Sequence, residues 1–167
     1  MSVVSQDVQV TEDPGQAAER AFREQAPRLW RSLLAFTGDP EIANDAMAEA
    51  FAQLLGRGAA IEAHDRWVWR AAFWVASGEL KERGRRVPKA ALEPSYEMPE
   101  PAIDLIRALA RLSPNQRACA ILHLYADLPT NEVARILGIR QGTVRVHLSQ
   151  ARRRLRNILE DHDERPA

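Results

Sequence analysis

The chain has 167 residues, of which 46% are hydrophobic and 28% charged, and its 23 basic and 23 acidic side chains leave a formal net charge of zero. This length is enough for one or two small domains with buried cores. A single cysteine, Cys119, rules out an internal disulfide framework and a cysteine metal cluster, and no apolar run approaches the ~20 residues that span a membrane.

The N-terminal residues carry no targeting pattern. Residues 1–15 are polar, end in an Asp-Pro-Gly turn signal and are expected to be disordered. They lack the basic and apolar regions of a signal peptide, which favours a cytoplasmic protein with no membrane insertion.

Three helices are predicted between residues 16 and 86. Apolar residues recur at helical spacing from Gln16 to Phe36, in one helix or in two, because Pro27 interrupts the pattern. After Gly38, the pair Asp39-Pro40 is typical of a capped helix start. The helix that follows turns a polar face outward, which consists of Asp45, Glu49 and Gln53. Residues 56–64 are predicted to form a loop.

The third helix, predicted from His64 to Arg86, is rich in aromatic residues. Arg70 is the only charged residue between Trp67 and Gly78, and a helix that is apolar on all sides is central to its domain or covered by a partner. The aromatic rings of this helix belong to Trp67, Trp69, Phe73 and Trp74. Its basic end contains Lys81, Arg83, Arg85 and Arg86.

A proline-rich linker is predicted to separate this region from a second group of helices. Residues 87–101 contain four prolines and no helical periodicity, and fully extended they could span about 50 Å. One helix begins at Ala102, and Ser113 to Gln116 form a capping box that opens another. The chain is therefore predicted to be all-α, with small helical domains at 16–86 and 102–160 and a tail at 161–167 that frays.

Residues 129–156 are predicted to form a helix, a tight turn and a second helix. Thr130 is expected to cap the first helix with its hydroxyl, and Glu132 places a carboxylate near the positive helix start. Gly138 suits a helix end that needs a positive φ, and Ile139 fills the corner. The second helix turns one apolar stripe to the core: Val144, Leu148, Ala151 and Leu155.

The remaining faces of the second helix are basic. Seven arginines and no acidic residue lie between Val133 and Leu159. A helix-turn-helix projects its second helix into the major groove of DNA, where arginine suits guanine, glutamine suits adenine and trailing arginines suit phosphates. The candidate DNA-binding residues here are Arg140, Gln141, Thr143, Arg145, His147, Ser149, Arg152, Arg153 and Arg156. An ordinary helical hairpin with a solvated basic face is the simpler alternative.

The sequence contains no pattern typical of catalysis or of a metal site. The four histidines (His64, His123, His147 and His162) lack metal-ligand spacing. Glycine-rich phosphate loops, nucleophile motifs and paired carboxylates do not occur. We expect neither an enzyme nor a bound cofactor.

The stretch LARLSPNQRACAILHLYADLPTNEVARILGIRQGTVRVHLSQARRRL resembles region 4 of bacterial sigma-70-family RNA polymerase sigma factors, in the extracytoplasmic-function (ECF) group. The Leu-Ser-Pro-x-Gln-Arg helix start, the pair Leu137-Gly138 and residues 142–145 carry this match. Residues 43–51 resemble the region 2 helix that docks on core polymerase. Trp67-Val68 and the basic end that follows resemble the promoter-melting helix, so that the resemblance covers roughly residues 17–160.

What the resemblance implies is a dissociable subunit of RNA polymerase. Region 4 would bind the −35 promoter element as duplex DNA. Region 2 would bind core RNA polymerase and capture the unpaired strand of the −10 element, where bases stack on aromatic rings and arginines hold the backbone. The candidate residues of region 2 are Trp67, Lys81, Arg83, Arg85 and Arg86 for DNA, and Asp45, Glu49 and Gln53 for core polymerase. An anti-sigma factor is a further partner that the resemblance allows.

Two other functions stay open. A stand-alone helix-turn-helix transcription regulator would use the first helices to dimerise or to sense a ligand. The other is a sigma-like interaction module without promoter-melting activity. The family usually has an asparagine near the position of Trp74 and an aspartate near that of Gly78, and these two departures keep this alternative open. The zero net charge predicts weak DNA binding by the chain alone. The first domain is slightly acidic, with 11 basic and 13 acidic residues in 1–86, and could also cover the Arg140–Arg156 face.

Overall fold

The part of the chain that the structure describes forms seven α-helices and no strand, which confirms the all-α prediction. The computed structural model describes residues 13–61, 63–86 and 99–163. Most of the predicted linker, residues 87–98, lies outside the described residues, as do residues 1–12 and 164–167. The helices are α1 (Pro14–Thr37), α2 (Pro40–Arg57), α3 (His64–Arg86), α4 (Glu100–Ala110), α5 (Pro114–Ala120), α6 (Thr130–Leu137) and α7 (Gln141–Asp163), with a 3-10 turn η1 (Gly58–Ala60) and a π turn η2 (Ile121–Tyr125).

Several predicted boundaries differ from the observed ones. The Asp-Pro-Gly sequence starts α1 instead of a disordered turn, and the Ala17 N–H donates to the Asp13 carbonyl at 3.0 Å. α1 then runs unbroken through Pro27. α2 and η1 occupy part of the predicted loop, and α7 continues to Asp163, into the tail that was expected to fray. α4 begins at Glu100, so the last two residues of the predicted linker are helical. These helices extend because their neighbouring turns are already packed, so each further residue adds a hydrogen bond at little entropic cost.

The first three helices form a bundle around aromatic and leucine side chains. Gly38 ends α1 with a φ of 68°, and the Asp39 carboxylate accepts hydrogen bonds from the first N–H groups of α2, as predicted. Inside the bundle, Leu29 and Leu33 of α1 are fully buried. The rings of Phe36 and Phe73 lie 5.2 Å apart between centroids, which fixes the crossing of α1 and α3.

The last four helices form the second half of the molecule. The predicted capping box at Ser113 is present: the Gln116 N–H donates to the Ser113 hydroxyl, and the Ser113 N–H donates to the Gln116 side chain, both at 3.3 Å. The helix that it opens continues through the π turn η2, and the chain then bends at Asp127, whose φ is 54°. Aspartate tolerates this left-handed conformation better than most residues. The bend brings α6 and α7 into position.

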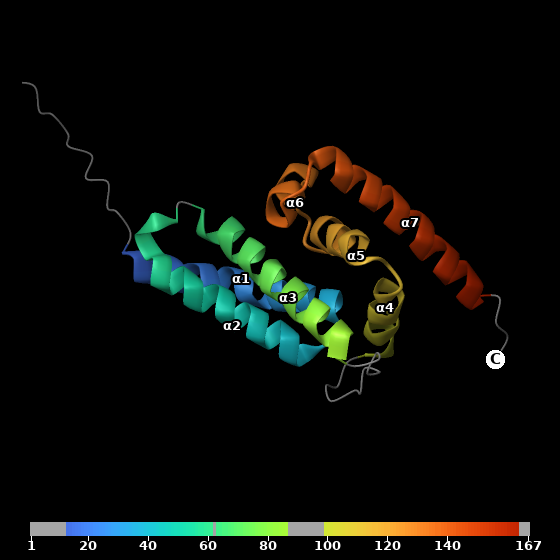
Figure 1. Ribbon diagram of the computed structural model, residues 1–167, viewed down its shortest axis with the longest axis horizontal. Coiled ribbons are helices and arrows are strands. Elements are labelled where there is room, and N and C mark those ends of the chain that lie inside the picture. Colours follow the sequence, from blue (N-terminus) through green and yellow to red (C-terminus); the bar gives the residue numbers. More distant parts are fainter. Residues whose placement is uncertain (1–12, 62, 87–98, 164–167) are drawn as a thin grey trace, which may run out of the picture.

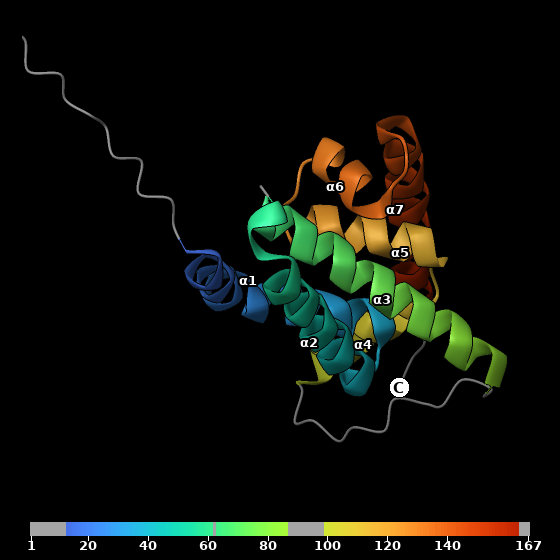
Figure 2. The same ribbon diagram turned by 60° about the vertical axis from the view of Figure 1, so that its left-hand side comes forward.

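The two halves pack against each other. Figure 1 shows α1, α2 and α3 gathered on one side, α5, α6 and α7 on the other, and α4 beside the end of the first bundle. In Figure 2, α3 lies between the first two helices and the second half. One continuous cluster of buried apolar side chains extends through both halves, in which α3 meets α6 and α1 meets α4. The two domains predicted from the sequence therefore share a buried contact in this arrangement.

Within residues 13–61, 63–86 and 99–163, none of the helices combines the length and the apolarity that a bilayer span requires.

Candidate nucleic-acid interface

The predicted helix-turn-helix is present, formed by α6, a three-residue turn and α7. Gly138 has a φ of 67°, and its N–H donates to the Ala134 carbonyl. Ile139 adds a second hydrogen bond to the same carbonyl at 3.1 Å and packs against the core. A side chain at Gly138 would be strained by this φ even though there is space for it. The turn thus fixes the angle between the two helices.

The face of α7 that was predicted to be apolar lies in the core. Val144, Leu148 and Ala151 are buried, and Leu155 is half-buried against them. The opposite face reaches solvent. Of the residues predicted to bind DNA, the exposed ones are Arg140, Gln141, Thr143, Arg145, Ser149, Arg152, Arg153 and Arg156. The first half of the molecule packs on α6 rather than over these side chains, so the idea that it covers them is wrong for this arrangement.

Two polar residues of this region differ from expectation. The Thr130 hydroxyl makes no cap for α6; it accepts a hydrogen bond from the Gln141 amide at 2.8 Å. Because the cap position is Pro129, one residue earlier than predicted, Thr130 points instead to the start of α7. His147 is half-buried, and its Nδ1 lacks a hydrogen-bond partner among the described residues. The Thr130 contact holds Gln141 in place and leaves its amide oxygen to accept another hydrogen bond.

The aromatic residues of α3 separate into buried and exposed rings. Trp69 and Phe73 are core residues, 2% and 1% exposed, stacked with their centroids 6.2 Å apart. Trp67 is half-buried, with the Arg57 guanidinium 5.6 Å from its ring. Trp74 is 76% exposed. Sequence alone could not separate these rings, because all four occur on one apolar helix.

The basic end of α3 includes one residue that is already engaged. The Arg83 guanidinium pairs with the Asp39 carboxylate that caps α2, and its other nitrogen lies 3.7 Å from Glu41. Lys81 is exposed and forms no ion pair with another described residue. The side chains of Arg85 and Arg86 lie outside the described part of the chain. Of the two basic side chains that the structure describes at this end, Lys81 is thus the more accessible to a phosphate.

The polar face of α2 is exposed, as predicted. Asp45 and Glu49 both reach solvent, and Gln53 donates to the Glu49 carboxylate at 2.6 Å. The residues between them, Ala46 and Ala50, are buried in the bundle. Two carboxylates one helical turn apart therefore form an acidic patch on the outside of α2, suited to a basic protein surface.

The comparisons with known proteins identify the family. Residues 102–155 match the family described as sigma-70, region 4. The chain is 30% identical over 154 residues to the RNA polymerase sigma-E factor of Streptomyces antibioticus, across 87% of this chain and 86% of that protein. It is also 30% identical over 153 residues to the ECF RNA polymerase sigma factor SigM of Mycobacterium tuberculosis, across 86% of this chain and 77% of that protein.

The chain belongs to the ECF group of the sigma-70 family.

Solved structures share the fold of this sigma factor. The sigma factor RpoE of Bartonella quintana, in complex with the anti-sigma factor NepR, superimposes with a TM-score of 0.74 at 20% identity, over 87% of this chain and 98% of that chain. CnrH, in complex with the cytosolic domain of CnrY, gives a TM-score of 0.67 at 16% identity, over 88% and 90%. The resemblance noted in the sequence is thus confirmed, and with it the function as a non-enzymatic RNA polymerase sigma factor.

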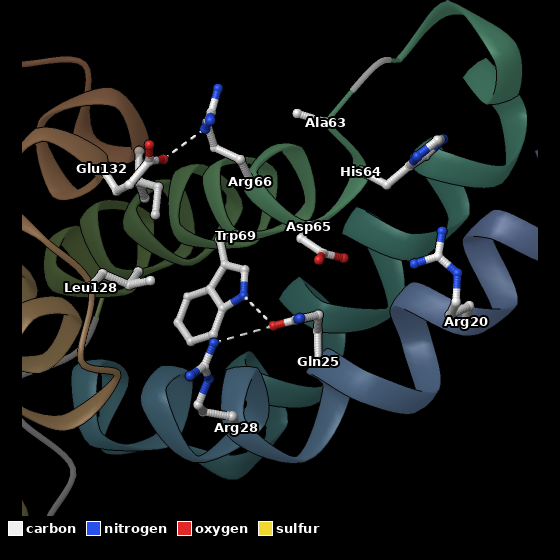
Figure 3. Close-up of a pocket in the computed structure, with 11 residues that line it drawn as sticks. Arg20, Gln25, Arg28, Ala63, His64, Asp65, Arg66, Trp69, Leu128 and Glu132 are labelled. Carbon is white, nitrogen blue, oxygen red and sulfur yellow. Dashed lines mark hydrogen bonds and ion pairs between the residues drawn. The ribbon is translucent and has the colours of Figure 1, made fainter.

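Between its two halves, the sigma factor has an open pocket of about 470 Å³ (Figure 3). On one side, Trp69 donates its indole N–H to Gln25 at 3.1 Å. On the other, the Arg66 guanidinium of α3 pairs with the Glu132 carboxylate of α6 at 2.6 Å. Glu132 also pairs with Arg135 in its own helix at 2.5 Å. The sequence predicted the helix-start role of Glu132 but not its cross-helix partner, because 66 residues separate the pair.

Arg117 joins the halves from within. Its Nη1 donates to the Phe36 carbonyl at 2.8 Å, where α1 ends. Its Nη2 donates to Ala110 at 3.3 Å and to Leu112 at 3.2 Å, where α4 ends. Burial lowers the pKa of Arg117, yet a guanidinium remains charged in proteins. Because the last carbonyls of a helix carry partial negative charge, the cation is placed where two helix ends favour it.

The single cysteine lies close to this junction in sequence. Cys119 is fully buried in α5, and burial raises the pKa of its thiol to about 11. Neutral thiols are weak nucleophiles, so Cys119 acts as a small apolar core residue, as expected.

Proposed function

We propose that this sigma factor directs core RNA polymerase to promoters by reading the −35 element with α7 and holding the −10 strand on α3. The observation that supports this most is the basic face of α7, which is exposed and free of acidic residues from Gln141 to Leu159. Exposed guanidinium groups release counterions on binding phosphates, which supplies most of the affinity for duplex DNA.

The first turn of α7 is proposed to read bases. Arg145 and Thr143 project from the part of the helix that enters the groove in this class of motif, and Gln141 is held beside them by Thr130. The later residues Arg152, Arg153 and Arg156 lie two to four turns further on, where the helix leaves the groove and meets the backbone. Base contacts would give specificity, and phosphate contacts would fix the register.

The acidic patch on α2 is proposed to bind core polymerase. Asp45 and Glu49 are exposed, and both carboxylates lie on the side of α2 away from the core. A basic surface on the enzyme would complement this charge and select the orientation of docking. In this reading the protein acts in the cytoplasm, where the polymerase is.

Simultaneous use of both DNA-binding helices is proposed to need separation of the halves. Promoter elements at −35 and −10 are centred about 25 base pairs apart, which is roughly 85 Å of duplex at 3.4 Å per base pair. The buried contacts of α3 with α6 and of α1 with α4 hold the two halves closer than that. The segment that joins α3 to α4 would have to let them part. Contact with one large enzyme would then make two weak DNA contacts multivalent.

An anti-sigma factor is proposed as the partner that keeps the protein inactive. The structurally similar RpoE was solved bound to the anti-sigma factor NepR. Both DNA-binding helices of the present chain have exposed faces, so a second protein that covers them would prevent promoter binding.

The test is a comparison of the full chain alone with the full chain plus core RNA polymerase. We expect core enzyme to retain the protein in a pull-down, and the complex to start run-off transcription from a specific promoter. Alone, the chain should shift promoter duplex weakly in a gel. Tight, sequence-specific binding by the chain alone would favour the stand-alone regulator. Binding to core enzyme without transcription from any promoter would favour the interaction module.

A further inference from the structure

The first residues of α6 and α7 are joined by a hydrogen bond between their side chains. Gln141 donates a side-chain N–H to the Thr130 hydroxyl oxygen at 2.8 Å, across eleven positions of the chain. Thr130 is half-buried and Gln141 is exposed. Among the described residues neither side chain forms a second hydrogen bond. The amide oxygen of Gln141 and the hydroxyl hydrogen of Thr130 are therefore both left for a partner outside the described residues.

The hydroxyl of Thr130 contributes nothing to the helix in which it lies. Pro129 occupies the cap position of α6, and no side chain caps this helix. A hydroxyl carries one donor and two acceptor sites, and Thr130 uses one acceptor site, for Gln141. Valine has the same branched shape and a similar helix propensity, so the fold of α6 does not require the hydroxyl.

The places of the two residues in the helix-turn-helix suit one to a phosphate and the other to a base. In this motif the first helix crosses the sugar-phosphate backbone, and the N-terminal residues of the second helix contact base edges. The positive end of α6 and the exposed Arg140 favour a phosphate beside Thr130. Glu132, the only carboxylate of α6, is already paired with Arg66 and Arg135. The Thr130 hydroxyl is thus suited to donate to a phosphate oxygen.

A phosphate on Thr130 would decide which way the Gln141 amide faces. A free hydroxyl can accept from the amide N–H or donate to the amide oxygen, so it allows both orientations. A hydroxyl that donates to a phosphate can only accept from the amide, which must then keep its nitrogen towards Thr130, as it does in the structure. Gln141 would present its oxygen and its second N–H to the groove. This acceptor–donor pair complements the amino group and N7 of adenine, whereas the O6 of guanine would face the amide oxygen.

We propose that Thr130 is a positioning residue, which binds a phosphate and fixes the Gln141 amide so that α7 selects adenine at one position of the −35 element. This deepens the proposed function, on which it rests, by naming a base and the residue that orients its reader. Thr130 itself touches no base. Its hydroxyl converts a side chain that could read several bases into one that reads adenine.

The decisive experiment uses the holoenzyme made from the full chain and core polymerase. Its probes are fluorescent duplexes that the wild-type holoenzyme selects from a pool randomised over the −35 element, and the readout is anisotropy. The position at which Gln141→Ala loses its base preference marks the contact. There the wild type should prefer adenine about five- to hundred-fold, Thr130→Val should lose most of this preference, and Thr130→Ser should retain it. Thr37→Val, which removes a half-buried hydroxyl at the end of α1, is the matched control and should bind as wild type does.

Two modified probes separate the phosphate contact from the base contact. Uncharged methylphosphonate replaces each phosphate in turn. At one position it should weaken binding of the wild type about ten-fold and leave Thr130→Val unaffected, because that contact is already lost. Replacement of the marked adenine by 7-deazaadenine, which lacks N7, should weaken binding of the wild type but not that of Gln141→Ala.

A Thr130→Val protein that keeps the preference for adenine, or that binds all sequences equally more weakly, would overturn the role of Thr130. So would a wild-type preference for another base at the marked position, or unchanged preferences of Gln141→Ala at every position. In each of these cases the holoenzyme would still select a −35 sequence, so the proposed function would stand. If the wild-type holoenzyme selected no sequence from the pool, the proposed function itself would fail.

Discussion

Replacing Arg117 by methionine tests whether this half-buried cation holds the two halves together. The change keeps the length and the apolar stem but removes the hydrogen bonds to Phe36, Ala110 and Leu112. Phe36 is only 1% exposed, so its carbonyl would lose a partner that water cannot readily replace, at about 1–3 kcal/mol. Ala110 is exposed, so its carbonyl can be rehydrated and should cost less. Leu112, just after α4, is only 3% exposed, so its carbonyl adds a cost like that of Phe36. We expect a total loss of about 2–4 kcal/mol in the free energy of unfolding.

Urea unfolding followed by circular dichroism measures this loss, and small-angle scattering measures the radius of gyration. The matched control is Arg111→Met, because Arg111 is an exposed arginine at the end of α4, next to the carbonyls that Arg117 contacts. Arg117→Lys retains the charge but not the planar guanidinium group, so the lysine should reach one carbonyl only. Its loss in free energy of unfolding should be roughly half that of Arg117→Met. The contact with Phe36 is the part that crosses between the halves, so the methionine variant should also be more expanded. Stability within ~0.5 kcal/mol of the control and an unchanged radius would refute the role assigned to Arg117.

Three further predictions concern DNA, polymerase and pH. The first measures binding of the holoenzyme to −35 duplex. Arg145→Ala should reduce the binding free energy by about 1–3 kcal/mol and relax specificity at one base pair, whereas Arg153→Ala should weaken binding to all sequences alike and reduce the salt slope by about one unit. Equal, sequence-independent losses for both variants would contradict the two roles. Asp45→Lys should lower the affinity for core polymerase and leave the helicity unchanged, whereas Glu24→Lys, at an exposed position of α1, should leave the affinity unchanged. Equal affinities of the two variants would exclude the α2 face as the surface that binds polymerase. Burial raises the pKa of the Cys119 thiol to about 11 in the folded protein, so the thiol of the unfolded state loses its proton at lower pH. As the pH rises from about 9 to 11, the free energy of unfolding of wild type should therefore fall by up to about 2 kcal/mol relative to that of Cys119→Ala. Parallel pH profiles of the two proteins would contradict this.

Local signals in the sequence were sufficient for the helix ends and the helix-turn-helix. Asp39 and Gly138 act within a few residues of their own positions, so short-range chemistry determines their roles. Thr130 shows where this reasoning fails: a hydroxyl near a helix start has several partners within reach, and here the side chain of Gln141 binds it. Pro27 is a similar case, because packing on both sides of it keeps α1 continuous.

Contacts between distant residues could not be predicted from the sequence. Arg117 reaches a carbonyl 81 residues away, and nothing in its local pattern indicates a helix end of the other half. The rings of α3 present the same difficulty. Trp69 and Trp74 occur in one apolar run, and only the position of the neighbouring helices decides that one is buried and the other exposed.

The pairing of Arg66 with Glu132 would couple the arrangement of the two halves to the proposed DNA binding by α3. Arg66 precedes Arg70 by one helical turn, and therefore belongs to the same row as Trp74 and Gly78 on α3. In the packed arrangement its guanidinium is held by Glu132 of the second half. If the halves part as proposed, Arg135 can still neutralise Glu132, and Arg66 would then be able to meet a DNA phosphate. A single side chain would then serve either the closed molecule or the DNA, and by thermodynamic reciprocity each strand that binds would favour opening as much as opening favours the strand.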